Sequence, residues 1–159
     1  MPTSQGINLA LIITVVIAFS VGSIYLTMLA LSRLTGWKKL AATYPGQAPA
    51  PNARTGFGSC GFHTLGNYNN CVRWASDDDH LHISLVKPFA QMGHPPISIP
   101  WAVIDIVDSK PGWGGFAKIK ADNVPIRIPA KAISAELELR QALASESLAE
   151  PRGSSAPLA

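Results

Sequence analysis

Two histidines and three consecutive aspartates near the middle of the chain are the residues best suited to bind a metal ion. Asp77, Asp78 and Asp79 are followed by His80 and His82. On a strand the two imidazoles would share one face, and imidazoles with a carboxylate are common ligands of transition metals. The alternative is that the aspartates form a solvated turn and the histidines an exposed polar face. We favour this alternative, and predict neither a metal nor a cofactor.

The two cysteines, Cys60 and Cys71, fall on the two arms of a predicted hairpin. Paired across strands, they would approach disulfide distance. A cytoplasmic domain keeps its thiols reduced, and a free cysteine behaves as a small buried hydrophobe. We therefore expect two reduced core residues. A structural zinc site is not expected, because the chain has no second pair of cysteines.

The most distinctive patch is His94-Pro95-Pro96, followed closely by Trp101. A rigid proline-framed loop that presents an imidazole and an indole is suited to dock a peptide or a lipid. The alternative is that the prolines fix the loop and the indole closes one end of the fold, and we favour this structural role. The candidate partner surface nevertheless consists of these four residues: His94, Pro95, Pro96 and Trp101.

No motif of catalytic chemistry organises the remaining polar residues. The glycine-rich stretch 112–116 lacks the G-x-x-x-x-G-K pattern of a phosphate-binding loop, and the chain has no G-x-S-x-G elbow. The net charge of +3 comes from scattered basic residues, whereas a nucleic-acid site needs a basic stripe with interleaved aromatic residues. We predict a protein that is neither an enzyme nor a nucleic-acid binder.

A long apolar run at residues 7–31 determines where the rest of the chain lies relative to a membrane. No charged side chain precedes Arg33. About 20 apolar residues cross the hydrocarbon of a bilayer, and a segment in lipid must be helical to satisfy its backbone. A cleaved signal peptide would have a basic start and a shorter apolar core, but residues 1–6 hold no lysine or arginine. We predict a single transmembrane helix within residues 1–34.

Basic residues flank this predicted helix on one side only. Arg33, Lys38 and Lys39 follow it, and positively charged flanks stay in the cytoplasm. The N-terminus is therefore expected outside, and the rest of the chain inside. Trp37 is expected either at the lipid headgroups, as an interfacial anchor, or in the core of the domain.

Ala18 and Gly22 form a small-xxx-small pair within the apolar run. Residues four apart lie on one face of a helix, and small side chains there let a second membrane helix approach closely. Such pairs also arise by chance in apolar segments, so the oligomeric state stays open.

The chain beyond the membrane segment predicts a small β-rich domain over residues 56–147. Residues 35–46 read as a short amphipathic juxtamembrane element, and residues 47–55 as a linker rich in proline and alanine. The predicted strands are Phe57–Leu65 and Tyr68–Ser76 around a Gly66-Asn67 turn, His80–Val86, Ile97–Val107 with a corner near Pro100–Val103, Trp113–Ala121, and Val124–Ile128.

A helix is predicted over Ala130–Ser147, before a polar tail at residues 148–159 that we expect to be disordered. Its expected apolar contacts are Ile133, Leu137, Leu139 and Leu143, and Glu136 and Arg140 are expected to pair. Pro125 places the preceding strand at a sheet edge. The predicted fold class is a mainly antiparallel split barrel or sandwich of six or seven strands, capped by the C-terminal helix.

Three pieces of sequence occur together in one order: G-W-K-K-L-A-A-T-Y-P at 36–45, N-Y-N-N-C-V at 67–72 and H-P-P-I-S-I-P-W-A-V-I at 94–104. They resemble a group of short bacterial proteins of unknown function that pair a membrane segment with a small β domain. The resemblance covers roughly residues 35–133 and implies the inner membrane of a bacterium. The order of elements also looks like the pleckstrin-homology-like or GRAM-like superfold, which implies a binding or scaffolding module.

We therefore expect a non-enzymatic accessory or scaffold protein whose cytoplasmic β domain binds a protein partner or a larger membrane complex. The alternative is a module that binds an anionic lipid surface. In that case the basic residues after the helix meet the headgroups, each gaining about 1 kcal/mol, and Lys118 and Lys120 extend the patch.

Overall fold

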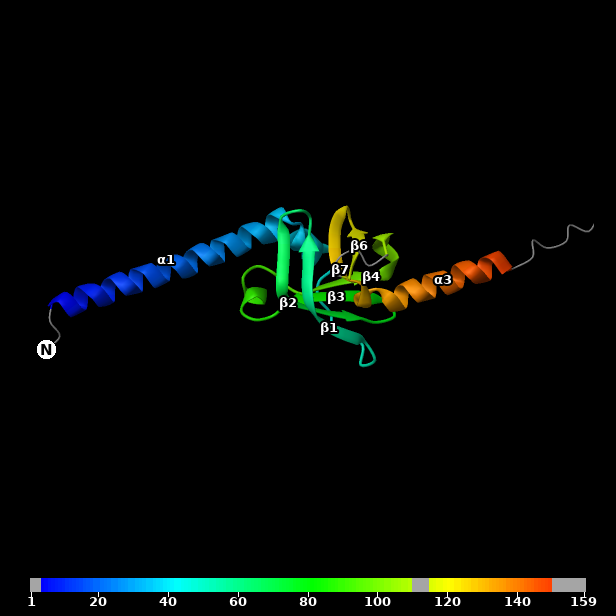
Figure 1. The fold of residues 1–159 in the computed structure, drawn as a ribbon, viewed down its shortest axis with the longest axis horizontal. Helices are drawn as coiled ribbons and strands as arrows, with labels where there is room; N and C mark the ends of the chain where they lie inside the picture. Colours follow the sequence, from blue (N-terminus) through cyan, green and yellow to red (C-terminus); the bar gives the residue numbers. More distant parts are fainter. Residues whose placement is uncertain (1–3, 110–114, 150–159) are drawn as a thin grey trace, which may run out of the picture.

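The computed structural model describes residues 4–109 and 115–149, and it begins with a long apolar helix. α1 spans Ser4–Leu34 and projects away from the rest of the molecule (Figure 1). Among the described residues, only the segment Asn8–Leu34 is long and apolar enough to cross a membrane. The hydroxyls within it donate to the carbonyl four residues earlier, at 2.8–2.9 Å, in Thr14, Ser20 and Thr27. The part of the chain that the structure describes thus has the single long apolar helix that the sequence predicts.

α2, Trp37–Thr43, forms within the predicted amphipathic juxtamembrane element, and it packs into the core of the domain. Gly36 takes φ +79° between the two helices, and a Cβ atom there would lie 2.9 Å from a methyl group of Val124. This sharp, close turn therefore requires glycine. Trp37 and Leu40 are completely buried, so α2 ties the end of α1 to the domain.

Seven antiparallel strands form one sheet that curls into a nearly closed barrel, in the order β4-β3-β2-β1-β7-β6-β5 (Figure 1). The two edge strands, β4 and β5, are neighbours in the sequence and are joined by the short 3₁₀ helix Trp101–Val103, at the predicted corner. The fold class predicted from the sequence is confirmed. The strands are β1 Arg54–Phe62, β2 Gly66–Ser76, β3 His80–Leu85, β4 Ile97–Pro100, β5 Ile104–Asp108, β6 Phe116–Ala121 and β7 Val124–Pro129.

The turn of the first hairpin differs from the prediction. It lies at residues 63–65, with His63 at φ 53°, and Gly66 belongs to β2. A Cβ atom on Gly66 would come within 2.5 Å of the Thr35 methyl group. It would also lie 2.7 Å from the Phe62 carbonyl oxygen across the hairpin. Glycine is therefore needed at this position both for the close approach of the sheet to the end of α1 and for the tight hairpin.

β7 lies inside the sheet, between β1 and β6, so its prediction as an edge strand was wrong. Pro125 is tolerated there because the β1–β7 ladder is short, pairing only Gly61 with Arg127 and Phe62 with Ile126. The missing N–H of proline is therefore not required for pairing with β1. The Pro125 carbonyl accepts a hydrogen bond from the His63 amide.

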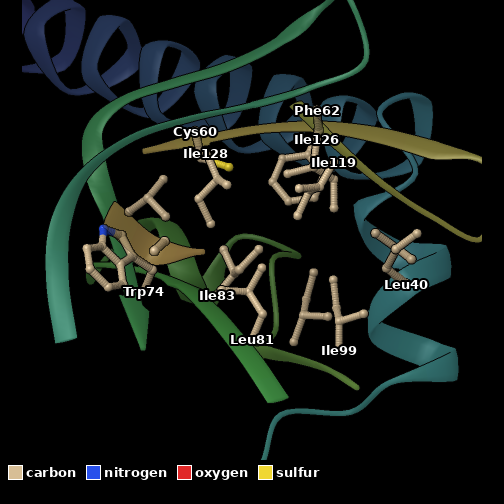
Figure 2. Packing of buried hydrophobic residues seen from close by; sticks show 14 of the residues in the cluster. Leu40, Cys60, Phe62, Trp74, Leu81, Ile83, Ile99, Ile119, Ile126 and Ile128 are labelled. Atoms are coloured by element: carbon tan, nitrogen blue, oxygen red, sulfur yellow. The ribbon is translucent and has the colours of Figure 1, made fainter. Parts of the chain in front are cut away.

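The core fills the barrel with side chains from both halves of the sheet, which point toward one another (Figure 2). The predicted alternation is confirmed in β3, where Leu81, Ile83 and Leu85 are buried, and in β6, where Ala117, Ile119 and Ala121 are buried. Leu40 closes one side of this core from α2 (Figure 2). Burial of each large aliphatic side chain contributes about 1.5–3 kcal/mol.

The C-terminal helix is fixed to the barrel at its start and projects from it beyond (Figure 1). A 3₁₀ turn, Ala130–Ala132, leads through the buried Ile133 into α3, Ser134–Ala149. The Arg140 guanidinium donates to the carbonyls of Trp101 and Ile104, at 2.7 and 3.1 Å, and so covers the corner between β4 and β5.

The predicted pair on α3 is confirmed, because Arg140 Nε lies 2.6 Å from Glu136 Oε1. The predicted apolar contacts of Leu139 and Leu143 were wrong, since these side chains are 52% and 56% exposed. The helix leaves the barrel at too early a point for its later turns to reach the core.

Candidate functional site

The segment of residues 45–50, here called the strap, crosses the outer face of β3 and β4. Pro45 forms a bridge with Ile97 of β4, and the Gln47 amide donates to Ser98 Oγ at 2.7 Å. A Cβ atom on Gly46 would lie 2.4 Å from the Pro96 Cβ atom. The strap therefore follows the surface closely, although the composition of residues 47–55 predicts a linker.

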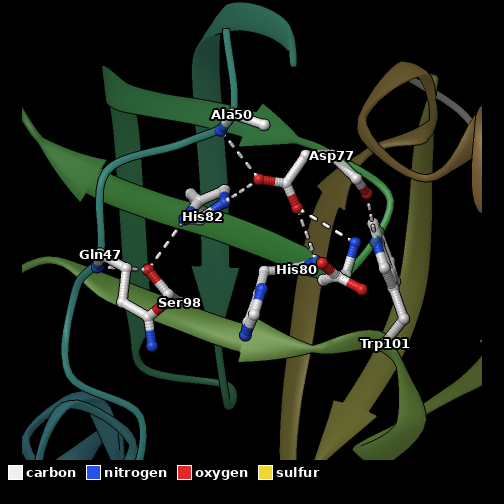
Figure 3. A network of polar contacts seen from close by, with 8 residues as sticks. Gln47, Ala50, Asp77, His80, His82, Ser98 and Trp101 are labelled. Carbon is white, nitrogen blue, oxygen red and sulfur yellow. Dashed lines mark hydrogen bonds and ion pairs between the residues drawn. The ribbon is translucent and has the colours of Figure 1, made fainter. Parts of the chain in front are cut away.

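Asp77, His82 and Ser98 hold the strap in place through one chain of hydrogen bonds (Figure 3). His82 Nε2 lies 2.8 Å from Asp77 Oδ2, and His82 Nδ1 lies 2.8 Å from Ser98 Oγ. The register of the sheet places His82 beside Ser98 on the outer face. His82 is only 7% exposed, so the prediction of an exposed histidine face was wrong at this residue, because the strap covers it.

The Asp77 carboxylate is the centre of the network and gives the aspartate turn its structure. Oδ2 accepts from the Ala50 amide of the strap at 3.1 Å, and Oδ1 accepts from the amides of Asp79 and His80. Burial raises the pKa of Asp77, but the hydrogen bonds outweigh burial and hold the pKa well below its usual range. Asp77 is therefore an ionised acceptor that joins the turn to the strap.

A serine, a histidine and an aspartate linked one after another by hydrogen bonds also make up the catalytic triad of a hydrolase. Here the Ser98 side chain is buried, and its Oγ already accepts the Gln47 amide proton. A nucleophile must reach the substrate carbonyl, whereas this hydroxyl lies beneath the strap. The arrangement acts as a clamp on the strap. In the described part of the chain, no three histidine, cysteine, aspartate or glutamate residues are grouped to hold a metal ion.

An open cavity of about 620 Å³ lies beside the clamp, between the strap and the outer face of β1–β3. One wall is the strap, and the floor is formed by side chains and backbone of the three strands. Its lining is mostly apolar and consists of Gln47, Pro49, Thr55, Gly56, Phe57, Arg73, Trp74, Ala75, His82, Ile83, Ser84, Pro96 and Ile97.

Phe57, Arg73 and Ser84 form one row across the outer face at the side of the cavity away from the clamp. Phe57 is 57% exposed, an unusual position for a large aromatic side chain. Arg73 is the only lysine or arginine among the lining residues, which include no carboxylate. No ion pair of Arg73 occurs within the described ranges 4–109 and 115–149.

Of the four residues predicted to form a partner surface, two are buried and two are exposed. His94 and Trp101 are buried, so neither presents a surface, and the predicted structural role fits both. Trp101 Nε1 donates to the Asp77 carbonyl at 2.8 Å. Pro95 and Pro96 are exposed, and Pro96 lines the cavity.

His94 belongs to an aromatic cluster that joins the end of α1 to the barrel. Its ring lies edge-on to Trp37 and Tyr68, with centroids 5.2 Å from each. Tyr68 Oη lies 2.8 Å from His94 Nε2, and His94 Nδ1 lies 3.1 Å from the Met92 carbonyl. Burial lowers the pKa of His94, so this imidazole is neutral at physiological pH and serves as a buried link.

Of the two roles expected for Trp37, the structure selects the core. The side chain is completely buried, and its Nε1 donates to the Pro95 carbonyl at 2.9 Å. Arg33, Lys38 and Lys39 are exposed around the exit of α1. Earlier in α1, Ala18 and Gly22 are exposed, and beyond the helix's own nearby backbone no heavy atom lies within 4 Å of the Cβ position of Gly22.

Both cysteines are free thiols in the structure. Cys60 is buried in the core, as predicted, whereas Cys71 is only partly buried at its margin. Burial raises the pKa of both thiols, which keeps them protonated at neutral pH. Most of the glycine-rich stretch 112–116 lies outside the described residues.

Sequence reasoning missed the strap clamp and the cavity because both depend on contacts between distant segments. Asp77 carried one usable signal, since an aspartate before a short turn often accepts the amides that follow it. Nothing local marks Ser98 or Arg73, because their partners and neighbours come from other strands.

Comparison of the chain with protein-family models, with curated proteins and with solved structures finds no match. The class of this protein is therefore described from its fold and its cavity. The protein is a small antiparallel barrel joined to one apolar helix long enough to span a membrane, with an open cavity beside a clamped strap.

Proposed function

We propose that this protein is a membrane-anchored docking module, which holds a segment of a protein partner in the cavity beside the strap. It is a non-enzymatic accessory or scaffold subunit of a larger membrane complex. The observation that carries the proposal is the cavity of about 620 Å³, a size typical of ligand sites. The exposed Phe57 at its side supplies an apolar contact of the kind found at binding sites.

The charge of the lining favours a partner segment with an apolar body and one acidic group. Arg73 is exposed and stands alone at the cavity, so a carboxylate bound beside it gains two parallel hydrogen bonds without displacing an existing ion pair. Among the described residues, β2 and β3 are paired with a strand on both edges, whereas β1 pairs with β7 only at Gly61 and Phe62. The docking proposed here relies on the side chains that line the cavity.

Only one end of the cavity lies far from the membrane anchor. The lining residues Ser84 and Pro96 flank the loop between β3 and β4, whereas Gly56 lies near the start of β1. Phe62, at the other end of β1, packs on Trp37 with ring centroids 4.6 Å apart, and six residues of extended strand separate it from Gly56 by about 20 Å. An occupant that reaches Phe57 and Arg73 must extend well into the domain, which favours a protein segment.

We also propose the inner membrane of a bacterium, with the N-terminus outside and the barrel in the cytoplasm. The exposed Arg33, Lys38 and Lys39 beside the exit of α1 support this orientation. The sheet of two meanders joined through β1, followed by a C-terminal helix, supports a pleckstrin-homology-like or GRAM-like relationship. The exposed pair Ala18 and Gly22 offers a close-packing face to a partner's membrane helix.

Site-specific crosslinking in intact membranes tests the docking proposal. A photoreactive phenylalanine analogue replaces Phe57, and the same analogue at Lys118, on the outer face of β6, is the matched control. We expect a discrete protein adduct at position 57 and none at 118. The adduct should be lost on adding Arg73→Glu and kept on adding Lys118→Glu. Equal crosslinking at both positions, or an adduct indifferent to Arg73→Glu, would contradict the proposal.

The alternative function is binding to an anionic lipid surface through the basic residues at the end of α1. Arg33, Lys38 and Lys39 are exposed there, and each gains about 1 kcal/mol near anionic lipid. Lys118, by contrast, lies on β6 with its ammonium 4.0 Å from Asp108. Flotation of residues 33–159, which keep all three basic residues, with phosphatidylcholine vesicles that do or do not contain phosphatidylglycerol separates the two functions. Peptide docking predicts no dependence on the anionic lipid.

A further inference from the structure

The apolar part of α1 is longer than the hydrocarbon layer that it would cross. Asn8–Leu34 contains 27 residues, and at 1.5 Å per residue it measures about 40 Å. The hydrocarbon of a bilayer is about 30 Å thick. For a helix that stands along the membrane normal, an excess of about 10 Å, or about seven residues, lies outside the hydrocarbon.

The barrel packs against one side of α1 over the last seven residues of this run. Residues 8–27 are all exposed, and burial begins at Met28, which packs against the core cluster. Ser32 and, just beyond the run, Thr35 are buried as well. The length of the helix and its contacts thus place the edge of the hydrocarbon at the same level, near Met28.

The loop between β3 and β4 reaches back along α1 to this level. Gly93, at φ +80°, packs so closely on α1 that a Cβ atom would lie 2.6 Å from Leu29 Cδ2. The Ser32 hydroxyl donates to the Gly93 carbonyl. Figure 1 shows this loop, in green, as the part of the barrel that extends farthest toward the N-terminal end of α1.

We propose that residues 87–93 of this loop rest on the membrane surface and form a second contact between the domain and phospholipid. Lys87 and Gln91 are exposed there, and Phe89 and Met92 are partly exposed. A lysine stem with apolar neighbours suits the headgroup layer, where the ammonium meets phosphate. The contact does not depend on the docking function, and it fixes the tilt of the barrel on the bilayer.

Photocrosslinking to lipid tests this contact. The full chain is reconstituted into phosphatidylcholine vesicles with and without phosphatidylglycerol, carrying a photoreactive amino acid at Gln91. Ser145, exposed on the projecting part of α3, is the matched control position. We expect severalfold more phospholipid adduct at position 91 than at 145 in both kinds of vesicle, because the length of α1 sets the position of the loop.

A lipid adduct at position 91 no stronger than at 145 would overturn the proposal. Thermal unfolding followed by tryptophan fluorescence verifies that both labelled proteins are folded. Hydrogen exchange gives a second reading on the unmodified chain: the amides of residues 87–93 should exchange more slowly in lipid vesicles than in a small detergent micelle, and equal rates would also count against the contact.

Discussion

Replacing Asp77 by asparagine tests whether one carboxylate clamps the strap to the barrel. Asp77 Oδ1 accepts from the amides of Asp79 and His80, and Oδ2 accepts from the Ala50 amide and from His82. Asparagine has one oxygen and one amino group, so one of these two pairs of donors must face another donor. Only a change of the His82 tautomer can relieve part of the mismatch.

The expected loss of stability follows from the number of donors left without an acceptor. Each buried donor without a partner costs about 1–3 kcal/mol. With one or two donors affected, Asp77→Asn should lower the free energy of unfolding by about 2 kcal/mol. The matched control is Asp78→Asn at an exposed neighbour, which should stay within about 0.5 kcal/mol of the wild type.

The assay is chemical unfolding of the full chain in mild detergent, followed by tryptophan fluorescence. Hydrogen exchange at Gln47 and Ala50 reports on the strap directly, and both amides should exchange faster in Asp77→Asn than in Asp78→Asn. If the two variants lose the same stability and the strap amides stay protected in both, the clamp described here does not hold the strap.

The pH dependence supplies an independent check on the same residue. Because hydrogen bonds hold the folded pKa of Asp77 below its unfolded value of about 4, its ionisation stabilises the fold above that pH. This stabilisation is lost as the pH falls below about 4 toward the lower folded pKa. The difference in stability between wild type and Asp77→Asn should therefore shrink in acid, and a difference that is constant from pH 7 to pH 3 would refute the assignment.

Three further predictions concern the core, the loop beside α1 and the thiols. Ile119→Ala, which opens a cavity in the barrel, should cost about 2–5 kcal/mol in the same unfolding assay. Gly93→Ala should lower the melting temperature, because the new methyl group meets Leu29 at a positive φ; an unchanged melting temperature would show that the loop does not pack on α1 as described. A maleimide should label the partly buried Cys71 before Cys60, slowly at pH 7 because burial raises both pKa values, and rapid labelling of Cys60 in the folded protein would contradict its burial.

The local sequence predicts those features that depend on neighbours along the chain. Alternation in residues 80–86 and 117–121 identifies the faces that enter the core, because side chains on a strand alternate between two faces. The apolar run before Arg33 identifies α1, because length and hydropathy alone decide whether a helix can cross lipid. The corner at residues 100–103 follows from a shift in the same alternation.

Only the tertiary structure decides what covers each face. His82 occupies a polar position of an alternating strand, yet it is buried, because a strap from 32 or more residues earlier lies across it. Trp37 follows the apolar helix as an interfacial anchor would, but it lies in the core, where it packs against the aromatic rings of Phe62 and Tyr68. Periodicity records which face of a strand is apolar, whereas the clamp, the cavity and the seating of the barrel on α1 arise from contacts between distant segments, which no local pattern encodes.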